Sequence, residues 1–227
     1  RISFAGGGTD LAAFYRNEPG AVISTAIDKY MYVTVNKYFD ENIILKYSRT
    51  ELVPRVSAVK HPILRECLLR TGLTNGVEIT SMADIVGGTG LGSSSSFTVG
   101  VLHALHAFKG EYRTAEQLAA GACEVEIERL KEPIGKQDQY IAAYGGFQFT
   151  EFRPDGKVRV DPLICPPGTL DRLSERLILL FTGITRKAGP LLRKARAKFS
   201  ANAAVLRRMR DQAHDAKRDL QNGRVDG

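Results

Sequence analysis

Apolar and polar residues alternate in short runs over much of the chain, and turn residues separate the runs. Such alternation is typical of strands that bury one face. The runs that predict strands are 1–5, 21–27, 31–36, 43–47, 77–80 and 145–150, with a further strand around Val158 and Val160. Because 21–27, 31–36 and 43–47 follow one another closely, we expect these three to form an antiparallel meander.

Apolar residues at helical spacing predict helices between the strands. One helix begins at Pro62 and ends at Gly72. Another begins in the serines 93–96 and carries Phe97, Val101, Leu105 and Phe108 on one face. A third follows the Thr114–Gln117 capping box and ends before Pro133, where a turn and a new helix start are expected over 133–139. A long basic helix is expected near the end of the chain, after an apolar run at 176–181 and a polar loop at 182–186.

The segment from Gly88 to Ser95 joins a predicted strand to a predicted helix. Alternating glycines let the backbone turn its N–H groups toward one point, and a helix start adds unpaired donors and the positive end of its dipole. These features predict a cradle for a polyphosphate. A Gly/Ser linker is the alternative. No G-K-[ST] follows, which excludes a P-loop, and the glycine spacing is too tight for a dinucleotide fingerprint.

A second glycine cluster, Gly6-Gly7-Gly8, follows the first predicted strand and leads into Thr9 and Asp10. Glycines at a strand end leave room for these two side chains to reach a ligand. A tight turn capped by Asp10 explains the same residues equally well, since Gly and Asp are common in turns.

Acidic residues cluster in two further places. Glu124 and Glu128 share a helical face, where they bind a cation, contact a basic partner or form a solvated acidic face. Asp138 lies near a helix start, which stabilises a carboxylate. His103 and His106 have a spacing that permits metal binding, but without acids or cysteines nearby in the sequence they are read as ordinary helix histidines.

The composition is that of a globular protein with ample core: 227 residues, 43% apolar and 25% charged. No apolar run approaches the ~20 residues that span a bilayer. Three distant cysteines without a C-x-x-C predict a reduced, cytoplasmic protein without a cysteine metal site. Because the chain begins at Arg1 inside a predicted strand, we expect a fragment of a longer protein.

The net charge of +7 is unevenly distributed. Residues 186–227 hold 12 Lys/Arg and 4 Asp/Glu, so the first 185 residues are close to neutral. A basic tail with few interleaved aromatic residues favours a solvated helix over a nucleic-acid-binding segment. A steep fall of nucleic-acid affinity with salt would identify the second alternative.

Three motifs in this order resemble the galactokinase, homoserine kinase, mevalonate kinase and phosphomevalonate kinase (GHMP) family. They are R-I-S-F-A-G-G-G-T-D at 1–10, G-T-G-L-G-S-S-S-S-F at 88–97 and P-I-G-K-Q-D-Q-Y at 133–140. The second is similar to the family's ATP motif, and the third to the segment that carries galactokinase's catalytic aspartate. The subgroup most similar is that of bacterial D-glycero-D-manno-heptose 7-phosphate kinases, which adjoins the L-fucose kinases.

The sequence departs from this family in three places. Val86 and Gly87 stand where the family has proline and alanine, and Gly7 and Gly8 replace galactokinase's Glu and His. The sugar contacts of galactokinase therefore do not carry over. The family's third glycine-rich motif, near the C-terminus, is absent, so the resemblance implies a missing segment.

The resemblance implies an α+β fold of two domains: an N-terminal half like domain 2 of ribosomal protein S5, over 1–165, and an incomplete ferredoxin-like half, over 166–227. It implies ATP and Mg²⁺ as cofactors. The expected ATP-binding residues are Gly88, Thr89, Gly90, Leu91, Gly92, Ser93, Ser94 and Ser95. Ser94 and Glu128 are the expected Mg²⁺ ligands, with Glu126 as the alternative if the helix alignment shifts by one residue.

The resemblance also implies a sugar kinase in which Asp138 accepts the proton of the attacking hydroxyl and Arg1 lies beside it. Asp138 is expected between the glycine loop and Asp10. The expected substrate contacts are Gly8, Thr9 and Asp10. The expected acceptor is the anomeric hydroxyl of a heptose 7-phosphate, whose phosphate needs basic residues, with Lys136, Arg186 and Lys187 as candidates. An L-fucose or galactose type of kinase and a non-catalytic nucleotide-binding regulator are the alternatives.

Overall fold

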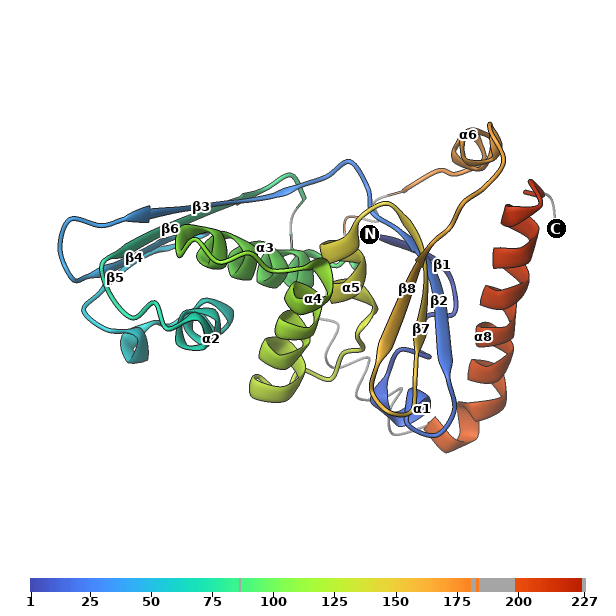
Figure 1. The fold of residues 1–227 in the computed structure, drawn as a ribbon, viewed down its shortest axis with the longest axis horizontal. Helices are drawn as coiled ribbons and strands as arrows, with labels where there is room; N and C mark the ends of the chain where they lie inside the picture. Colours follow the sequence, from blue (N-terminus) through green and yellow to red (C-terminus); the bar gives the residue numbers. More distant parts are fainter. Residues whose placement is uncertain (86, 181–182, 184–198, 226–227) are drawn as a thin grey trace. The chain divides into compact units, whose positions relative to one another are not determined.

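The computed structural model describes residues 1–85, 87–180, 183 and 199–225. Its contacts divide the chain into two compact units, each with its own four-stranded sheet (Figure 1). Unit 1 comprises residues 1–27, 133–137 and 145–227, and unit 2 comprises residues 28–132 and 138–144. The mixed α+β prediction is confirmed. The halves named by resemblance, with a boundary after residue 165, stay a prediction.

The sheet of unit 1 is antiparallel throughout, in the order β1-β2-β7-β8. Its strands are β1 (Ile2–Ala5), β2 (Gly20–Thr25), β7 (Phe147–Phe152) and β8 (Val158–Pro162). The helices in the described part of this unit are α1 (Ala12–Tyr15), α6 (Thr169–Glu175) and α8 (Phe199–Gln221).

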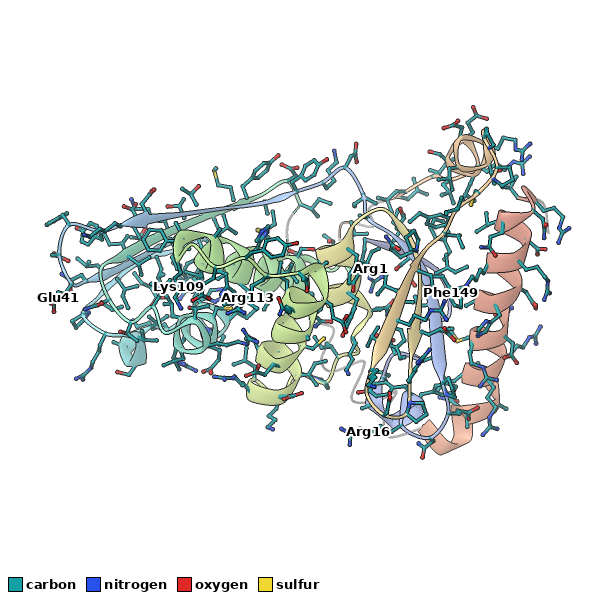
Figure 2. The ribbon with its side chains drawn as sticks, viewed as in Figure 1. Arg1, Arg16, Glu41, Lys109, Arg113 and Phe149 are labelled. Carbon is teal, nitrogen blue, oxygen red and sulfur yellow. The ribbon has the colours of Figure 1, made fainter. Side chains whose placement is uncertain are left out.

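Helix α8 lies along β1 and β2 (Figure 1). Phe149 of β7 contributes to the interface (Figure 2): its ring lies 5.1 Å from that of His214, and the ammonium of Lys217 lies 4.0 Å from its centroid. The predicted basic helix therefore packs against the sheet, and some of its basic side chains interact with residues of the same unit. Arg207 and Arg210 of the same helix form ion pairs with Glu18.

The sheet of unit 2 has the order β3-β6-β4-β5. Its strands are β3 (Met31–Lys37), β4 (Ile43–Lys46), β5 (Thr50–Val53) and β6 (Val77–Ala83), and β4 pairs with β6 in parallel. The helical elements are η1 (Val56–Ala58), α2 (Pro62–Thr71), α3 (Ser93–Phe108), α4 (Ala115–Cys123), η2 (Glu124–Arg129) and α5 (Gln137–Tyr144).

Helices α2 and α3 cover one face of this sheet (Figure 1), and the alternation of β3 explains why. Met31, Val33 and Val35 turn toward the helices, while the residues between them are exposed. The core they join is closed by buried residues of the other elements, including Ile43, Leu45, Leu68, Ile79, Leu102, Leu105, Ala122 and Val125. The core therefore fixes the position of α3, whose N-terminus carries the glycine loop.

One expectation about topology is wrong. The meander does not form, because β2 belongs to the other sheet and β6 lies between β3 and β4. After Pro162, Leu163 is buried and its N–H donates to the carbonyl of Phe147. Residues 177–180 have no regular secondary structure.

Of the described helices, none combines the length and the apolar character that crossing a membrane requires.

Candidate functional site

The glycine loop of unit 2 has the open backbone that the sequence predicts. Gly88, Gly90 and Gly92 have φ values of 84°, 80° and 78°, in the left-handed region that favours glycine. A Cβ atom at Gly90 would have no atom within 4 Å. The glycines at 87, 88 and 90 are exposed. The loop therefore surrounds open space instead of packing against the core.

The loop ends at the N-terminus of α3, with Gly92 as the N-cap. Gly92 makes no side-chain cap, and the first hydrogen bond of the helix runs from the Ser96 N–H to the Gly92 carbonyl, at 3.0 Å. The N–H groups of Ser93, Ser94 and Ser95 therefore precede the helical ladder, where the helix dipole is positive. This arrangement fits the phosphate groups of a nucleotide.

Glu126 is the acid that lies beside the serines. The Ser94 hydroxyl donates to Glu126 Oε1 at 2.6 Å, and the Gln139 amide donates to Glu126 Oε2 at 2.7 Å. Glu126 is only 1% exposed. Burial raises its pKa above the ordinary value, hydrogen bonds from Ser94, Gln139 and Ser95 oppose that rise, and the charge of Asp138 adds to it.

A π-helical turn explains why Glu126, and not Glu128, reaches Ser94. Residues 124–129 form η2, in which the N–H of Leu130 bonds to the carbonyl of Val125, five residues earlier. This widened turn rotates the side chains relative to an α-helix. Glu128 is exposed, so the geometry does not support it as a ligand beside Ser94. Glu126, the alternative that the sequence left open, is the acid that bonds to Ser94, and its role as a metal ligand stays a prediction.

Glu124, expected to share a face with Glu128, has basic partners. Arg70 of α2 donates to its Oε2 at 2.9 Å, and Arg129 donates to its Oε1. These bonds lower the pKa of Glu124 below its ordinary value, although burial alone would raise it. The ion pairs attach the outer face of η2 to α2, while Glu126 on the inner face is buried.

Asp138 lies in the first turn of α5, as expected from the sequence, and is half-buried. Its charge acts on the pKa of Glu126, so the two carboxylates belong to one electrostatic environment within unit 2. Arg1 and Asp10 belong to unit 1. The expected approach of Arg1 to Asp138, and the place of Asp138 beside Asp10, stay predictions.

The glycine cluster of unit 1 is closed. Thr9 is fully buried, and its hydroxyl donates to the carbonyls of Gly6 and Ala21 and accepts from the N–H of Ala21. A hydroxyl used in this way holds the loop on β2. This corrects the expectation that Thr9 reaches a ligand.

Asp10 is also buried, at 2% exposure, and it binds backbone groups. Its Oδ1 accepts from the N–H of Gly8 at 3.0 Å, and its Oδ2 accepts from the N–H of Gln137 at 3.1 Å. A Cβ atom at Gly135 would overlap this carboxylate. Asp10 therefore holds the turn that precedes α5, which is close to the capping alternative. Roles for Asp10 and Gly8 in substrate binding stay predictions.

Of the basic residues considered for a substrate phosphate, only Lys136 is described. Its ammonium donates to the Gly156 carbonyl at 2.9 Å and lies 5.0 Å from the centroid of the Tyr15 ring. Arg186 and Lys187 lie outside the described residues.

A comparison with protein families matches residues 55–146, which include the glycine loop and η2, to the family described as GHMP kinases N terminal domain. The chain contains a GHMP kinase N-terminal domain. A D-glycero-α-D-manno-heptose 7-phosphate kinase of Campylobacter jejuni is 32% identical over 207 residues, covering 83% of this chain and 59% of that protein. A bifunctional fucokinase/GDP-fucose pyrophosphorylase of Arabidopsis thaliana is 24% identical over all of this chain and 24% of its own length. The chain thus spans well under two thirds of both curated relatives.

Solved structures share the fold of this chain. A D-glycero-D-manno-heptose 1-phosphate kinase of Bacteroides thetaiotaomicron superposes with a TM-score of 0.84 at 24% identity, over 98% of this chain and 71% of that one. A Lactococcus lactis galactokinase complexed with galactose gives 0.64 at 15% identity, over 98% and 68%. At such identities the likeness concerns the fold alone.

The Ser94–Glu126 pair of this GHMP kinase domain fits a magnesium ion in its chemistry. Mg²⁺ prefers oxygen ligands and commonly takes only one or two from the protein, with phosphates and water supplying the rest. A hydroxyl and a carboxylate beside the N-terminus of α3 meet that need. In the described residues, no group of three or more His, Cys, Asp or Glu side chains forms a metal cluster, so a site with several protein carboxylates is not indicated there.

Sequence reasoning missed Gln139. It is fully buried on α5 and bonds to Glu126, yet only its place after Asp138 in the third motif drew attention to it. The signal for Gln139 is its place two residues before the apolar Ile141 in a helix. A glutamine buried beside such a residue needs a hydrogen-bond partner.

Proposed function

We propose that this chain is the nucleotide- and sugar-binding part of an ATP-dependent sugar kinase. The reaction transfers the γ-phosphoryl group to a hydroxyl of a sugar or sugar phosphate. The observation that supports this most directly is the open glycine loop at the N-terminus of α3, with the Ser94 hydroxyl bonded to the buried Glu126. It provides amides for phosphate oxygens beside hard oxygen ligands for a cation.

Each group has a distinct task in this proposal. The backbone N–H groups of residues 88–95 bind the phosphates, and Ser94 and Glu126 would hold Mg²⁺, which neutralises charge on the phosphate oxygens when bound. Asp138 accepts the proton of the attacking hydroxyl or orients that hydroxyl. Arg1 offsets charge on the transferred group. Gly8 and Asp10 contribute to sugar binding, Asp10 chiefly through the turn that it holds.

The acceptor that we favour is the anomeric hydroxyl of a heptose 7-phosphate, because the Campylobacter jejuni relative carries that substrate in its name. A kinase of the L-fucose or galactose type is the second candidate, favoured by the fucokinase among the relatives. We further propose a cytoplasmic location, because the three cysteines lie far apart in the sequence and form no C-x-x-C motif.

The decisive experiment assays the full-length protein with ATP and Mg²⁺ against a panel of sugars and sugar phosphates. Turnover of a heptose 7-phosphate with the highest kcat/KM supports the favoured acceptor. Nucleotide binding without turnover of any sugar would instead indicate a non-catalytic regulator.

The same assay tests Asp138 through Asp138→Asn, which keeps the shape and removes the proton acceptor. General-base catalysis contributes ~10²–10⁴-fold, so we expect kcat to fall by about that factor while ATP affinity stays unchanged. Asp171→Asn is the matched control, because Asp171 is an exposed aspartate in the first turn of α6. A fall in kcat of less than about tenfold for Asp138→Asn would assign the acid a structural role.

A further inference from the structure

Gln139 is a glutamine buried in the interior of unit 2, and it is 0% exposed. Its side-chain amide donates to Glu126 Oε2 at 2.7 Å, while the Ser94 hydroxyl donates to the other oxygen of the same carboxylate. The carboxylate is therefore held from two sides, by a serine at the N-terminus of α3 and by a glutamine of α5. Such bonds fix the orientation of a side chain that has few other polar contacts.

The oxygen atom of the same amide, Oε1, indicates that a ligand binds nearby. Among the described residues, Gln139 Oε1 has no hydrogen-bond partner, although it is buried. A buried amide oxygen without a donor costs free energy, and native structures seldom keep one without a purpose. Water molecules on a hydrated cation are strong donors, so a cation held by the neighbouring carboxylate would bring the missing donor with it.

We propose that Gln139 is the positioning residue of the metal-binding carboxylate: it orients Glu126 for Mg²⁺ and supplies an acceptor to the water around the ion. The inference rests on the proposed function in that it takes Ser94 and Glu126 as the Mg²⁺ ligands. Outer partners of this kind commonly contribute 10–100-fold to metal affinity, since they fix ligand geometry. In consequence, the first turn of α5 carries both Asp138 and the residue that holds the metal carboxylate.

A purely structural role would make Gln139 equivalent to Gln148, which is the matched control. Gln148 is 7% exposed, its amide donates to the Gly145 carbonyl, and its Oε1 also has no partner in the described part of the chain. Among the described residues, the hydrogen bond of the Gln148 side chain goes to a backbone carbonyl and not to a carboxylate. Methionine is close in size to glutamine and removes the buried amide at either position. Only Gln139→Met removes a hydrogen bond to Glu126.

The test uses the full-length protein with Mn²⁺, which takes oxygen ligands as Mg²⁺ does, and a non-hydrolysable ATP analogue. Free and bound Mn²⁺ are distinguished by electron paramagnetic resonance. For Gln139→Met we expect the Mn²⁺ dissociation constant to rise 10–100-fold, with binding of the analogue in EDTA unchanged. In the kinase assay the Mg²⁺ concentration for half-maximal rate should rise by a similar factor, and kcat at saturating Mg²⁺ should change by less than about threefold. Gln148→Met should leave the Mn²⁺ dissociation constant within twofold of wild type.

Several outcomes would overturn the proposal. One is an Mn²⁺ dissociation constant for Gln139→Met within twofold of wild type, or shifted no more than that of Gln148→Met. Another is a wild-type protein that binds the analogue but no Mn²⁺. If Gln139→Met does not fold, Gln139→Asn decides, because it keeps the amide but withdraws it from Glu126, and the same rise in dissociation constant is expected. Failure of both variants to fold, where Gln148→Met folds, would assign Gln139 a structural role.

The binding measurement also separates this inference from the proposed function. A wild-type protein that binds Mn²⁺ with the analogue, loses it on Gln139→Met and phosphorylates no sugar would support the inference while refuting the kinase activity. If the protein phosphorylates a sugar and Gln139→Met leaves its Mg²⁺ requirement unchanged, the kinase activity is supported and the inference on Gln139 is refuted.

Discussion

The two glycine clusters look alike in the sequence and differ in the structure. Each follows a strand and leads into hydroxyl or carboxyl side chains. The loop around Gly90 is open, since a Cβ atom added there would have no neighbour within 4 Å, and Ser94 beyond it is exposed. The cluster around Gly6 is closed, because Gly6 packs against the carbonyl of Ala21 and Thr9 is fully buried. Glycine thus leaves the backbone open in one cluster and permits close packing in the other.

The sharpest test of this difference compares alanine at the two glycines. Gly6→Ala adds a Cβ that overlaps the Ala21 carbonyl at a left-handed residue, so we expect it to lower the free energy of unfolding by about 3–5 kcal/mol. Gly90→Ala carries only the left-handed strain, about 1–2 kcal/mol, and should weaken nucleotide binding. Urea unfolding and nucleotide titration measure both. Equal destabilisation by the two variants would show that the clusters do not differ as described.

The hydroxyls beside the two clusters provide a second test. Thr9→Val removes a buried hydroxyl that makes three hydrogen bonds to backbone groups, and we expect a loss of about 2–3 kcal/mol in stability, with Thr9→Ser close to wild type. Ser94→Ala should cost about 1 kcal/mol or less and should raise the Mg²⁺ requirement at least tenfold. Unchanged stability of Thr9→Val combined with a raised KM for sugar would restore the ligand role of Thr9.

The smallest expected effects concern two buried glutamates of unit 2. The pKa of Glu126 is raised, so its charge opposes folding, and Glu126→Gln should increase stability at pH 8 by about 1 kcal/mol, or ~2–4 °C in Tm. Burial of Glu51 alone would raise its pKa. Its bonds to the Lys60 N–H, the Tyr47 hydroxyl and the His61 N–H lower the pKa overall.

The negative charge of Glu126 therefore lowers the stability of the fold, whereas that of Glu51 raises it. The carboxylate of Glu51 stabilises the fold above the ordinary pKa of ~4.3, and that stability is lost as the pH falls through its lowered pKa. Glu51→Gln should lower stability at pH 8 by about 1 kcal/mol, and this difference from wild type should shrink as the pH falls below the ordinary pKa of a glutamate. Thermal unfolding over this pH range measures both variants. A decrease in stability for Glu126→Gln at pH 8 would mean that this glutamate is a structural residue like Glu51.

The sequence was sufficient to predict the glycine loop, because its chemistry lies in consecutive residues. Strand, alternating glycines, serines and an amphipathic helix each have a local signature, and the structure reproduces them over 77–108. The identity of the acid beside Ser94 could not be predicted, because the choice between Glu126 and Glu128 depends on a π-turn. A single widened turn has no clear signature in the side-chain pattern, and the capping and apolar spacing before it are those of an α-helix.

Long-range pairing explains the other errors. The meander failed because β6, which is distant in sequence, pairs with both β3 and β4. Thr9 was expected at a ligand because one of its hydrogen-bond partners, Ala21 on β2, lies in a different strand that its local sequence does not indicate. Turn chemistry shows that a polar side chain is needed at such positions. It does not show whether the partner is a ligand or a distant part of the same protein.

The order in which the strands appear along the chain has a consequence for protein synthesis. Strands β3 to β6 all lie between residues 31 and 83, so the sheet of unit 2 can pair soon after residue 83 leaves the ribosome. Strand β2 must wait for β7, with which it pairs from Gly20–Phe152 to Thr25–Phe147. Until then the buried strand residues Ala21, Val22 and Ile23 have only β1 beside them, and an apolar strand with an unpaired edge invites aggregation. A nascent chain paused before residue 147 is therefore the species of this protein that most needs a chaperone.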